Sequence, residues 1–242
     1  MPFKTKIKGA ALVTGGAKRL GRQVALHLAK AGYHIALHYH HSKADAMATA
    51  QAIYKTGMRC ELFSCDLTDE TDVLKLVPEV FKAFPNFNVL VNSASVFLPD
   101  RFGAADLTLF KMHWDTNFKA PYILTCEFAR LVKRGQVINF IDANTTQNKT
   151  CYADYLMTKK ALLEFTKMAA VQWGPRIRVN GVSPGMILAP VNRPDDRLKR
   201  ARQIPLQKIG KPGNILQTIQ FLLENDYLTG QIITNDGGEN LI

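Results

Sequence analysis

The stretch Thr14-Gly15-Gly16-Ala17-Lys18-Arg19-Leu20-Gly21 decides the fold. An apolar run at 10–14 before it predicts a β-strand, and helical periodicity over 19–31 follows it. Gly15 permits a tight turn, Gly21 lets the helix pack close to the strand, and free backbone N–H groups at the start of the helix can face a diphosphate. A structural turn explains many glycine-rich matches, but a strand before and a helix after favour a dinucleotide-binding site.

The same alternation of short apolar runs with helical segments continues along the chain. Such alternation is typical of βαβ units and a parallel sheet. The pattern therefore predicts a single α/β domain over residues 1–242, a Rossmann-type, doubly wound sheet of seven parallel strands with helices on both faces. The predicted strands are 10–14, 34–38, 59–64, 89–92, 136–141, 177–182 and 231–234, and the predicted helices are 19–31, 43–56, 69–84, 106–132, 152–173 and 213–224.

The composition argues against several classes of protein. Of the 242 residues 47% are apolar, yet no stretch approaches the roughly twenty apolar residues of a membrane helix, so we expect no membrane partner and a cytoplasmic location. The net charge of +11 comes from scattered lysines and arginines rather than a basic run, which argues against a nucleic-acid partner. The four cysteines lack the spacing of zinc ligands, so we expect free thiols and no metal.

The end of the second strand bears on the choice of cofactor. In sheets that bind NAD, an acidic residue there takes the ribose hydroxyls and would repel the extra phosphate of NADP. This chain has His38-Tyr39-His40-His41-Ser42 instead, and the glycine turn adds Lys18 and Arg19. Because cations and hydrogen-bond donors suit a phosphate, the sequence favours NADPH over NADH. A merely polar strand end and metal binding by the histidines are the alternatives.

Further motifs follow in order and resemble the short-chain dehydrogenase/reductase family over nearly the entire chain. The glycine turn is similar to the T-G-x-x-x-x-x-G form of that family, and Tyr155-Leu156-Met157-Thr158-Lys159 is similar to its Y-x-x-x-K. The resemblance implies a nicotinamide-dependent oxidoreductase. It also implies cofactor contacts at Asp66-Leu67 beside adenine, at Asn92-Ser93-Ala94 after the fourth strand, at Tyr155 and Lys159, and at Pro184-Gly185-Met186 after the sixth strand.

The spacing of Tyr155 and Lys159 has a chemical consequence. Residues four apart lie on one face of a helix. A lysine ammonium beside a tyrosine favours the phenolate, so we expect Lys159 to lower the pKa of Tyr155 and to let it donate a proton at neutral pH. Asn117 falls at the helical asparagine of the family, and the resemblance implies that it holds a water between Lys159 and bulk solvent.

Asp142 stands where ketone-reducing members of the family carry a serine. In carbonyl reduction negative charge develops on oxygen, and a serine stabilises it by donating a hydrogen bond, whereas an ionised aspartate opposes it. Hydride addition to a ring C=N needs a proton on nitrogen, which a shielded carboxyl group can deliver. Asp142 therefore favours reduction of a carbon–nitrogen double bond. The alternative is a structural acid that binds backbone N–H groups in a chain that has lost activity.

Variants of these motifs resemble the pteridine reductase branch of the family. The resemblance implies reduction of dihydropterins, with folates as a further substrate class, by NADPH. It places the flat pterin between the nicotinamide and Phe97, near Arg19 and Ser95 and within reach of Asp142 and Tyr155. A core position beside Leu98 is the alternative for Phe97. Two departures stand out: His41 replaces the arginine of protozoan members, which predicts modest NADPH affinity, and Ser93 replaces the second asparagine of N-N-A-S.

Three classes of function stay open. The leading one is an NADPH-dependent pterin reductase. The second is a 3-oxoacyl-[acyl-carrier-protein] reductase or general carbonyl reductase, which the basic surface favours through an acidic carrier protein and Asp142 disfavours. The third is a non-catalytic dinucleotide-binding regulator, against which Tyr155 and Lys159 argue.

Two expectations concern the periphery. The substrate loop at about 186–203 offers Arg193 and Arg197 as partners for the glutamate tail of a folate, with solvated surface as the alternative. Members of the family usually assemble as tetramers, so the resemblance implies a homotetramer joined through the helices at 106–132 and 152–173.

Overall fold

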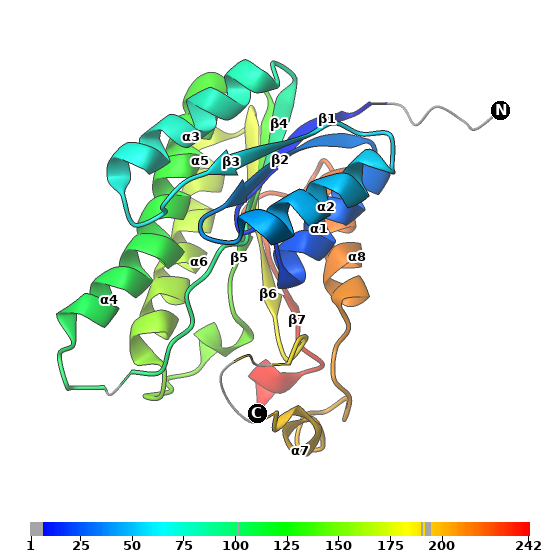
Figure 1. The fold of residues 1–242 in the computed structure, drawn as a ribbon. Coiled ribbons are helices and arrows are strands. Elements are labelled where there is room, and N and C mark those ends of the chain that lie inside the picture. The colour runs from blue at the N-terminus through cyan, green and yellow to red at the C-terminus, as the bar shows by residue number, and fades with distance from the viewer. Residues whose placement is uncertain (1–6, 101, 190, 192–194) are drawn as a thin grey trace.

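Seven parallel strands form one sheet in the order β3-β2-β1-β4-β5-β6-β7 (Figure 1). The computed structural model describes residues 7–100, 102–189, 191 and 195–242. All seven predicted strands are confirmed, with ends displaced by no more than two residues. Their bounds are β1 Gly9–Val13, β2 Tyr33–Tyr39, β3 Cys60–Ser64, β4 Phe87–Asn92, β5 Gly135–Phe140, β6 Ile177–Pro184 and β7 Ile232–Asn235.

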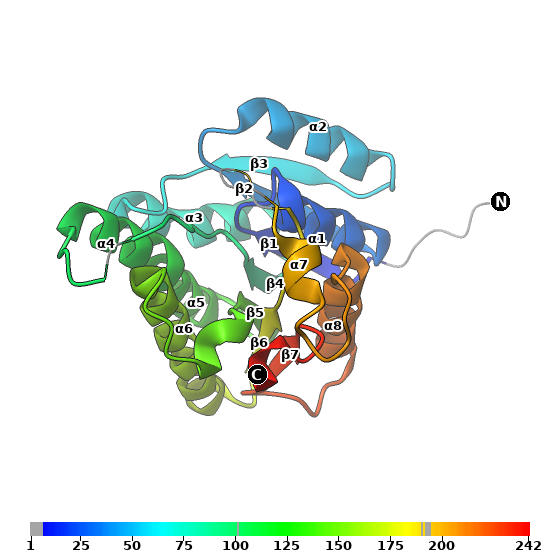
Figure 2. The same ribbon diagram turned by 90° about the horizontal axis from the view of Figure 1, so that it is seen from below.

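Helices cover both faces of the sheet, which confirms the predicted fold class (Figures 1 and 2). Each face encloses its own apolar core, built from alternate residues of the strands and from the inner sides of the helices. One face carries α1 Arg19–Lys30, α2 Lys43–Tyr54 and α8 Pro212–Glu224, and the other carries α3 Glu70–Ala83, α5 Ala120–Leu131 and α6 Ala153–Trp173. Among the described residues, no helix is long and apolar enough to cross a membrane.

The segment 106–132, predicted as one helix, is interrupted. It forms α4 Leu107–Trp114, a π-helical turn η1 Asp115–Lys119 and then α5. Pro121 has no N–H, so the regular α-helical bond from that position to the carbonyl of Asn117 cannot form. The π-turn accommodates this missing donor and sets Asn117 where the helix axis changes.

The chain reverses its course through the sheet between β1 and β4. Strands β2 and β3 lie on one side of β1, whereas β4 to β7 follow on the other. The carboxyl ends of β1 and β4 therefore form the switch point at which open α/β sheets bind ligands. Thr14 ties these ends together, since its Oγ1 accepts hydrogen bonds from the backbone N of Ser93 at 3.0 Å and of Ala94 at 3.1 Å.

Candidate active site

Asp142, Tyr155 and Lys159 come together at the carboxyl end of β5. Asp142 follows that strand directly, and Tyr155 and Lys159 lie one turn apart on α6. The hydroxyl of Tyr155 donates to Oδ2 of Asp142 at 2.9 Å, and Nζ of Lys159 donates to the backbone oxygen of Phe140 at 2.8 Å. Both α6 side chains are buried, whereas Asp142 is partly exposed, so the acid is the most accessible member of the group.

The two carboxylate oxygens of Asp142 have different partners. Oδ1 accepts from the backbone N and from Nδ2 of Asn144, both at 2.8 Å, and thereby caps the short 3-10 helix η2 Ala143–Thr146. Oδ2 faces Tyr155. One oxygen of the carboxylate thus has the structural, capping role that the sequence left as an alternative, and the other faces the tyrosine, so the reactive role stays a prediction.

The electrostatics of Tyr155 differ from the sequence prediction. Burial, and then the charge and hydrogen bond of Asp142, raise the pKa of Tyr155 well above its usual value. The expected lowering by Lys159 is not found, because the ammonium donates to Phe140 and lies 5.7 Å from the centroid of the tyrosine ring. Burial also lowers the pKa of Lys159 to about 8, against an opposing pull from Asp142. Tyr155 therefore keeps its proton at neutral pH.

Asn117 uses its side chain to hold the segment that follows β4. Its Oδ1 accepts from Oγ of Ser95 at 3.1 Å and from the backbone N of Val96 at 2.8 Å, while its Nδ2 donates to the Val96 oxygen at 2.9 Å. The amide oxygen and one N–H of the amide are therefore engaged with protein. Binding of a water by Asn117 would fall to its backbone carbonyl, and that role stays a prediction.

The glycine turn fits a dinucleotide. Gly15 has a positive φ of 64°, and a Cβ at Gly21 would lie 2.3 Å from the Gly15 carbonyl oxygen, so both positions exclude a side chain. A Cβ at Gly15 would also come within 3.0 Å of Ala94 Cα. The first turn of α1 holds no acidic residue, so its positive end is open to a phosphate. These residues can hold the diphosphate of a nicotinamide dinucleotide.

His38 has a different role from the one predicted. Its Nδ1 accepts from the backbone N of Gly15 at 3.0 Å, and its Nε2 lies 3.0 Å from the carbonyl oxygen of Cys65. Burial lowers the pKa of His38 to about 4, so the ring is neutral and donates through Nε2. Because both ring nitrogens are hydrogen-bonded to the backbone, His38 stabilises the glycine turn and is not a phosphate ligand.

The other residues predicted around the adenosine end fall into two groups. The side chains of Leu20, Tyr39 and Leu67 pack with the apolar cores, so any cofactor contact there uses their backbone. Asn92 is also buried and donates to Oδ1 of Asn139 at 2.8 Å, tying β4 to β5. The polar side chains at the surface are Lys18, Arg19, His40, His41, Ser42 and Asp66.

Nearby acids and carbonyls already engage several of these cations. Lys18 Nζ lies 3.0 Å from Oδ2 of Asp45, and His40 Nε2 lies 3.7 Å from Oδ2 of Asp66. Burial would raise the pKa of Asp66, but hydrogen bonds from Thr68 and the neighbouring His40 lower it. An anion that binds here must compete with these carboxylates, and the exposed His41 and the partly exposed Ser42 are further candidate donors.

The loop after β6 contacts the glycine turn. Arg19 donates to the carbonyl oxygen of Ala189 at 2.7 Å, which joins the two segments across the predicted pyrophosphate site. Gly185 excludes a side chain because its Cβ would lie 2.6 Å from Asp236 Cβ, and Met186 packs with Ala201 of the short helix α7 Arg197–Ala201. Ala189 of the loop therefore lies against the glycine turn, and Met186 against α7.

The structure describes only one of the two arginines proposed to bind the glutamate tail of a folate. Arg193 lies outside the described residues. Arg197 forms a two-pronged ion pair with Asp195, at 2.8 Å and 2.7 Å, and donates to the Ile187 oxygen at 3.1 Å. Its guanidinium stabilises the loop, which favours the alternative interpretation of a surface residue.

Phe97 lies directly against Tyr155. Its ring meets that of Tyr155 edge-on with centroids 4.7 Å apart, and it stacks on Tyr152 at 4.3 Å with an interplanar angle of 16°. Phe97 is 47% exposed, so it is not the core residue that was the alternative. Phe97 and Tyr152 together form an aromatic wall beside Tyr155. Tyr152, which directly precedes α6 with a positive φ of 58°, was not among the predicted site residues. An exposed aromatic ring here can stack on a flat heterocycle.

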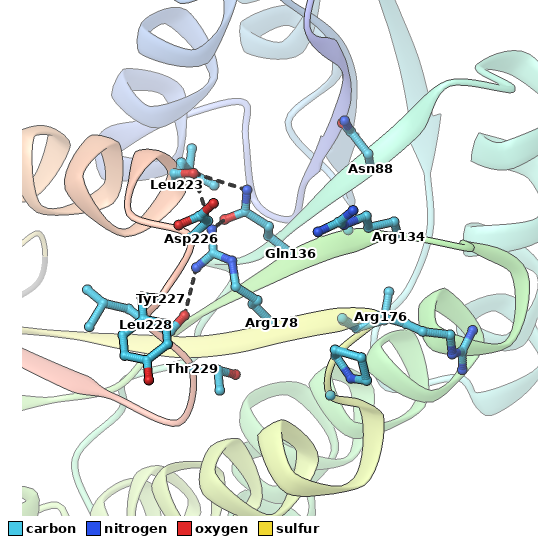
Figure 3. Close-up of a pocket in the computed structure, with 14 residues that line it drawn as sticks. Asn88, Arg134, Gln136, Arg176, Arg178, Leu223, Asp226, Tyr227, Leu228 and Thr229 are labelled. Atoms are coloured by element: carbon cyan, nitrogen blue, oxygen red, sulfur yellow. Dashed lines mark hydrogen bonds between the residues drawn. The ribbon is translucent and has the colours of Figure 1, made fainter.

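A hollow of about 770 Å³ lies at the opposite, amino-terminal edge of β5 and β6 (Figure 3). Arg178 lines it, but its guanidinium donates to the backbone oxygens of Leu228 at 2.7 Å and Leu222 at 3.0 Å. None of the predicted site residues lines this hollow. The chemically equipped region is the carboxyl edge, where strand ends, the glycine turn and the tyrosine meet.

Comparisons with known proteins fit this arrangement. A family model described as "Enoyl-(Acyl carrier protein) reductase" matches residues 15–240. The chain belongs to the short-chain dehydrogenase/reductase family. As a member of this family it is an oxidoreductase, as predicted. The 3-oxoacyl-[acyl-carrier-protein] reductase FabG of Staphylococcus aureus is 32% identical over 249 residues, which cover 96% of this chain and 98% of the relative.

Two solved structures of this family are similar over nearly their full length. FolM Alternative dihydrofolate reductase 1 from Brucella canis, complexed with NADP, has a TM-score of 0.93 and 32% identity, covering 98% of this chain and 96% of that chain. The protein of the same name from Brucella suis, also with NADP, has a TM-score of 0.92 and 33% identity, covering 97% and 96%. These similarities confirm the predicted Rossmann-type fold.

Proposed function

We propose that this enzyme reduces a dihydropterin to its tetrahydro form with NADPH. The observation that carries this proposal is the hydrogen bond from the Tyr155 hydroxyl to Oδ2 of Asp142 at 2.9 Å. NADP(H) is the cofactor of this short-chain reductase, as in the two Brucella FolM structures. Both neighbours are described as alternative dihydrofolate reductases, whose named reaction is also the reduction of a ring C=N.

The reaction needs one hydride at carbon and one proton at nitrogen. NADPH supplies the hydride when bound. The proton passes from the Tyr155 hydroxyl to Oδ2 of Asp142, toward which it donates, and from Asp142 to the ring nitrogen. This transfer leaves Asp142 ionised and Tyr155 as a phenolate, which takes its proton back from solvent before the next turnover. The bonds from Asn144 keep the other carboxylate oxygen fixed, so Oδ2 stays aimed at the site. Lys159 donates to the Phe140 carbonyl and lies 5.7 Å from the centroid of the tyrosine ring, so its charge is near the site without lowering the pKa of Tyr155.

The substrate would lie on the wall formed by Phe97 and Tyr152. Stacking on Phe97 brings the ring next to Tyr155, since these two aromatic side chains are in contact. The resemblance adds Ser95, after β4, and Arg19, at the start of α1, as further contacts of the substrate. This assignment follows the resemblance to pteridine reductases and rests here on the exposure of Phe97 and on its contacts.

The second candidate is reduction of a 3-oxoacyl carrier-protein thioester, which the FabG relative favours. In that reaction an oxyanion develops beside the tyrosine. The Oδ2 atom of Asp142 is directed at that place and cannot donate a hydrogen bond when ionised. The Asp142–Tyr155 geometry therefore supports the pterin over the ketone.

The test is NADPH oxidation at 340 nm by the purified protein. Dihydrobiopterin, dihydromonapterin and dihydrofolate are compared with an acetoacetyl thioester across acid and neutral pH. We expect turnover of a dihydropterin that increases toward acid pH, because the reaction consumes a proton. Turnover of the thioester alone would refute the proposal and establish the carbonyl reductase.

A further inference from the structure

Three titratable side chains that the proposed reaction does not use gather beside the catalytic tyrosine. They are His113 on α4, Asp100 in the segment after β4, and Asp154 in the first turn of α6, with their polar atoms within 4.8 Å of one another. His113 is fully buried, and its ring centroid lies 6.4 Å from that of Tyr155. The cluster thus adjoins the site without being part of the proton path.

The hydrogen bonds define the tautomer of His113. The backbone N of Leu98 donates to its Nε2 at 3.2 Å, so Nε2 carries no proton. Burial lowers the pKa of His113 against the pull of Asp154 and Asp100, which favours the neutral ring. The proton then sits on Nδ1, a buried atom without a hydrogen-bond partner among the described residues, and Asp100 Oδ1 is a buried acceptor of the same kind. An N–H donor suits a space shared with two carboxylates.

A divalent cation is the other occupant that this set of groups suggests. A cation would need the lone pair of Nδ1, which moves the proton to Nε2. Two N–H groups, those of His113 and Leu98, would then face each other at 3.2 Å. The hydrogen bond from Leu98 therefore favours the Nδ1–H tautomer without a metal.

The segment that His113 holds is the one that carries Phe97. Asn117 binds its start at Ser95 and Val96, His113 binds Leu98, and Asp100 Oδ2 accepts from the backbone N of Asp154 at 2.9 Å. Phe97 lies between these attachments and is itself half exposed. Without the bond at Leu98, Phe97 would be held on one side only, at Val96.

We propose that His113 is a positioning residue whose Nδ1–H tautomer, which turns Nε2 toward the Leu98 N–H and Nδ1 toward Asp100 and Asp154, anchors Leu98 and so holds Phe97 in place for the substrate ring. The inference rests on the proposed function for the identity of that ring. His113 touches neither substrate nor cofactor in this scheme and acts through the backbone of Leu98. Its effect is therefore on the binding of the substrate rather than on the chemical step.

Two substitutions separate positioning from general destabilisation. His113→Gln retains an amide oxygen for Leu98 and an N–H for the carboxylates, whereas His113→Leu has neither. For the leucine variant we expect the KM for the dihydropterin to rise about tenfold, with kcat and the Kd for NADPH within about twofold of wild type, because one hydrogen bond that orders a binding segment is removed. The glutamine variant should restore the KM. Equal KM values in wild type and the leucine variant, or a glutamine variant as impaired as leucine, would overturn the proposal.

Two further measurements do not depend on turnover. Hydrogen exchange should show the Leu98 amide protected in wild type and in His113→Gln and unprotected in His113→Leu. The ¹⁵N shifts of the imidazole should report the Nδ1–H tautomer, and they should not change when Mn²⁺ or Zn²⁺ is added. An Nε2–H tautomer, or a shift on addition of metal, refutes the positioning role even if the enzyme reduces pterins. A wild type that reduces only the thioester refutes the proposed function, while these two measurements still decide the role of His113.

Discussion

Oδ2 of Asp142 lies 2.9 Å from the hydroxyl of Tyr155, and this contact reverses the effect that a Tyr-x-x-x-Lys motif has on its tyrosine. A lysine alone would favour the phenolate. Here burial and the Asp142 carboxylate both favour the protonated phenol and raise the pKa of Tyr155. The pair therefore holds a proton at neutral pH, which suits a reaction that must protonate nitrogen.

Replacing Asp142 with serine should separate the two reactions. Serine can still cap η2, so the fold around Asn144 is retained. We expect dihydropterin turnover to fall by roughly 10²- to 10⁴-fold, the usual contribution of a general acid. Reduction of the acetoacetyl thioester should survive or increase, because serine donates a hydrogen bond to an oxyanion. Steady-state kinetics with both substrates test this, and unchanged pterin turnover would contradict it.

Lys159→Met should abolish activity and stabilise the protein. The pKa of Lys159 is about 8 in the fold against 10.5 ordinarily. Below pH 8 the buried charge costs about 3 kcal/mol, of which about 1 is offset by the bond to Phe140. Methionine removes this cost, so Tm at pH 7 should rise by roughly 4 to 8 °C.

The stability gained by Lys159→Met should depend on pH. Between pH 8 and 10.5 the unfolded chain binds a proton at Lys159 that the folded chain does not, so the stability of the wild type rises with pH in that window. The advantage of Lys159→Met should therefore shrink as the pH approaches 10.5. A variant less stable than wild type at pH 7, by scanning calorimetry, would mean that Lys159 contributes more through Phe140 than its burial costs.

The fold could be predicted because the spacing of apolar residues identifies each strand and helix, and the positions of the glycines identify the turn after the first strand. The central strands are largely buried apolar runs, whereas the edge strands β3 and β7 are partly exposed. The glycine turn at Gly15 and Gly21 is a backbone requirement that the sequence displays directly. The spacing of apolar residues did not reveal the π-helical turn at 115–119, since these residues keep a helical pattern. Pro121 is the available signal, because it removes the donor for the carbonyl four residues earlier.

The sequence predicted which residues belong to the site better than it predicted their hydrogen-bond partners. Motif order identified Asp142, Tyr155 and Lys159, but the partner of each side chain depends on distances between elements far apart in sequence. His38 illustrates this, since a histidine at a strand end suits a phosphate until the fold places Gly15 and Cys65 against its two nitrogens. The bond between Asp142 and Asn144 could have been predicted from the sequence, because an aspartate at the start of a short helix commonly caps the backbone N–H two residues later.

His38 should make the enzyme lose stability in acid. Its pKa is about 4 in the fold and 6.5 ordinarily, so the unfolded chain binds the extra proton between these values. Stability from this residue is present above pH 6.5 and declines by about 3 kcal/mol as the pH falls to 4. His38→Asn, which does not titrate, should be less stable at pH 7.5 but show a shallower decline. Urea denaturation at several pH values tests this, with His41→Asn, a substitution of an exposed histidine, measured beside it.

Ser42→Asp should shift the coenzyme preference toward NADH. The substitution places a carboxylate at the end of β2, next to His41, where it can accept from ribose hydroxyls and repel the extra phosphate of NADPH. The ratio of kcat/KM for NADPH to that for NADH should fall about tenfold or more, because a new negative charge beside the phosphate weakens its binding. Thr71→Asp adds the same charge on the exposed surface of α3 and should leave the ratio unchanged. Equal ratios in both variants would place the phosphate elsewhere.

The helices on the α4 to α6 side should join copies of the chain into a homotetramer. Aromatic rings line this side without a break, from Phe110 to Trp114 at 5.9 Å and on to Phe118 at 4.9 Å. On α6, Met168 and Val171 are 70% and 85% exposed, an apolar surface that water does not favour.

Association through this side can be tested by mass. Light scattering should give four times the 27.0 kDa of the chain. Replacing both Met168 and Val171 with glutamate should lower that mass, since each new charge would have to be buried without a partner. Leu74→Glu, on the half-exposed surface of α3, serves as the matched control and should keep the wild-type mass. A wild type that elutes as a monomer, or a double variant that still forms the full assembly, would show that these helices do not form the interface.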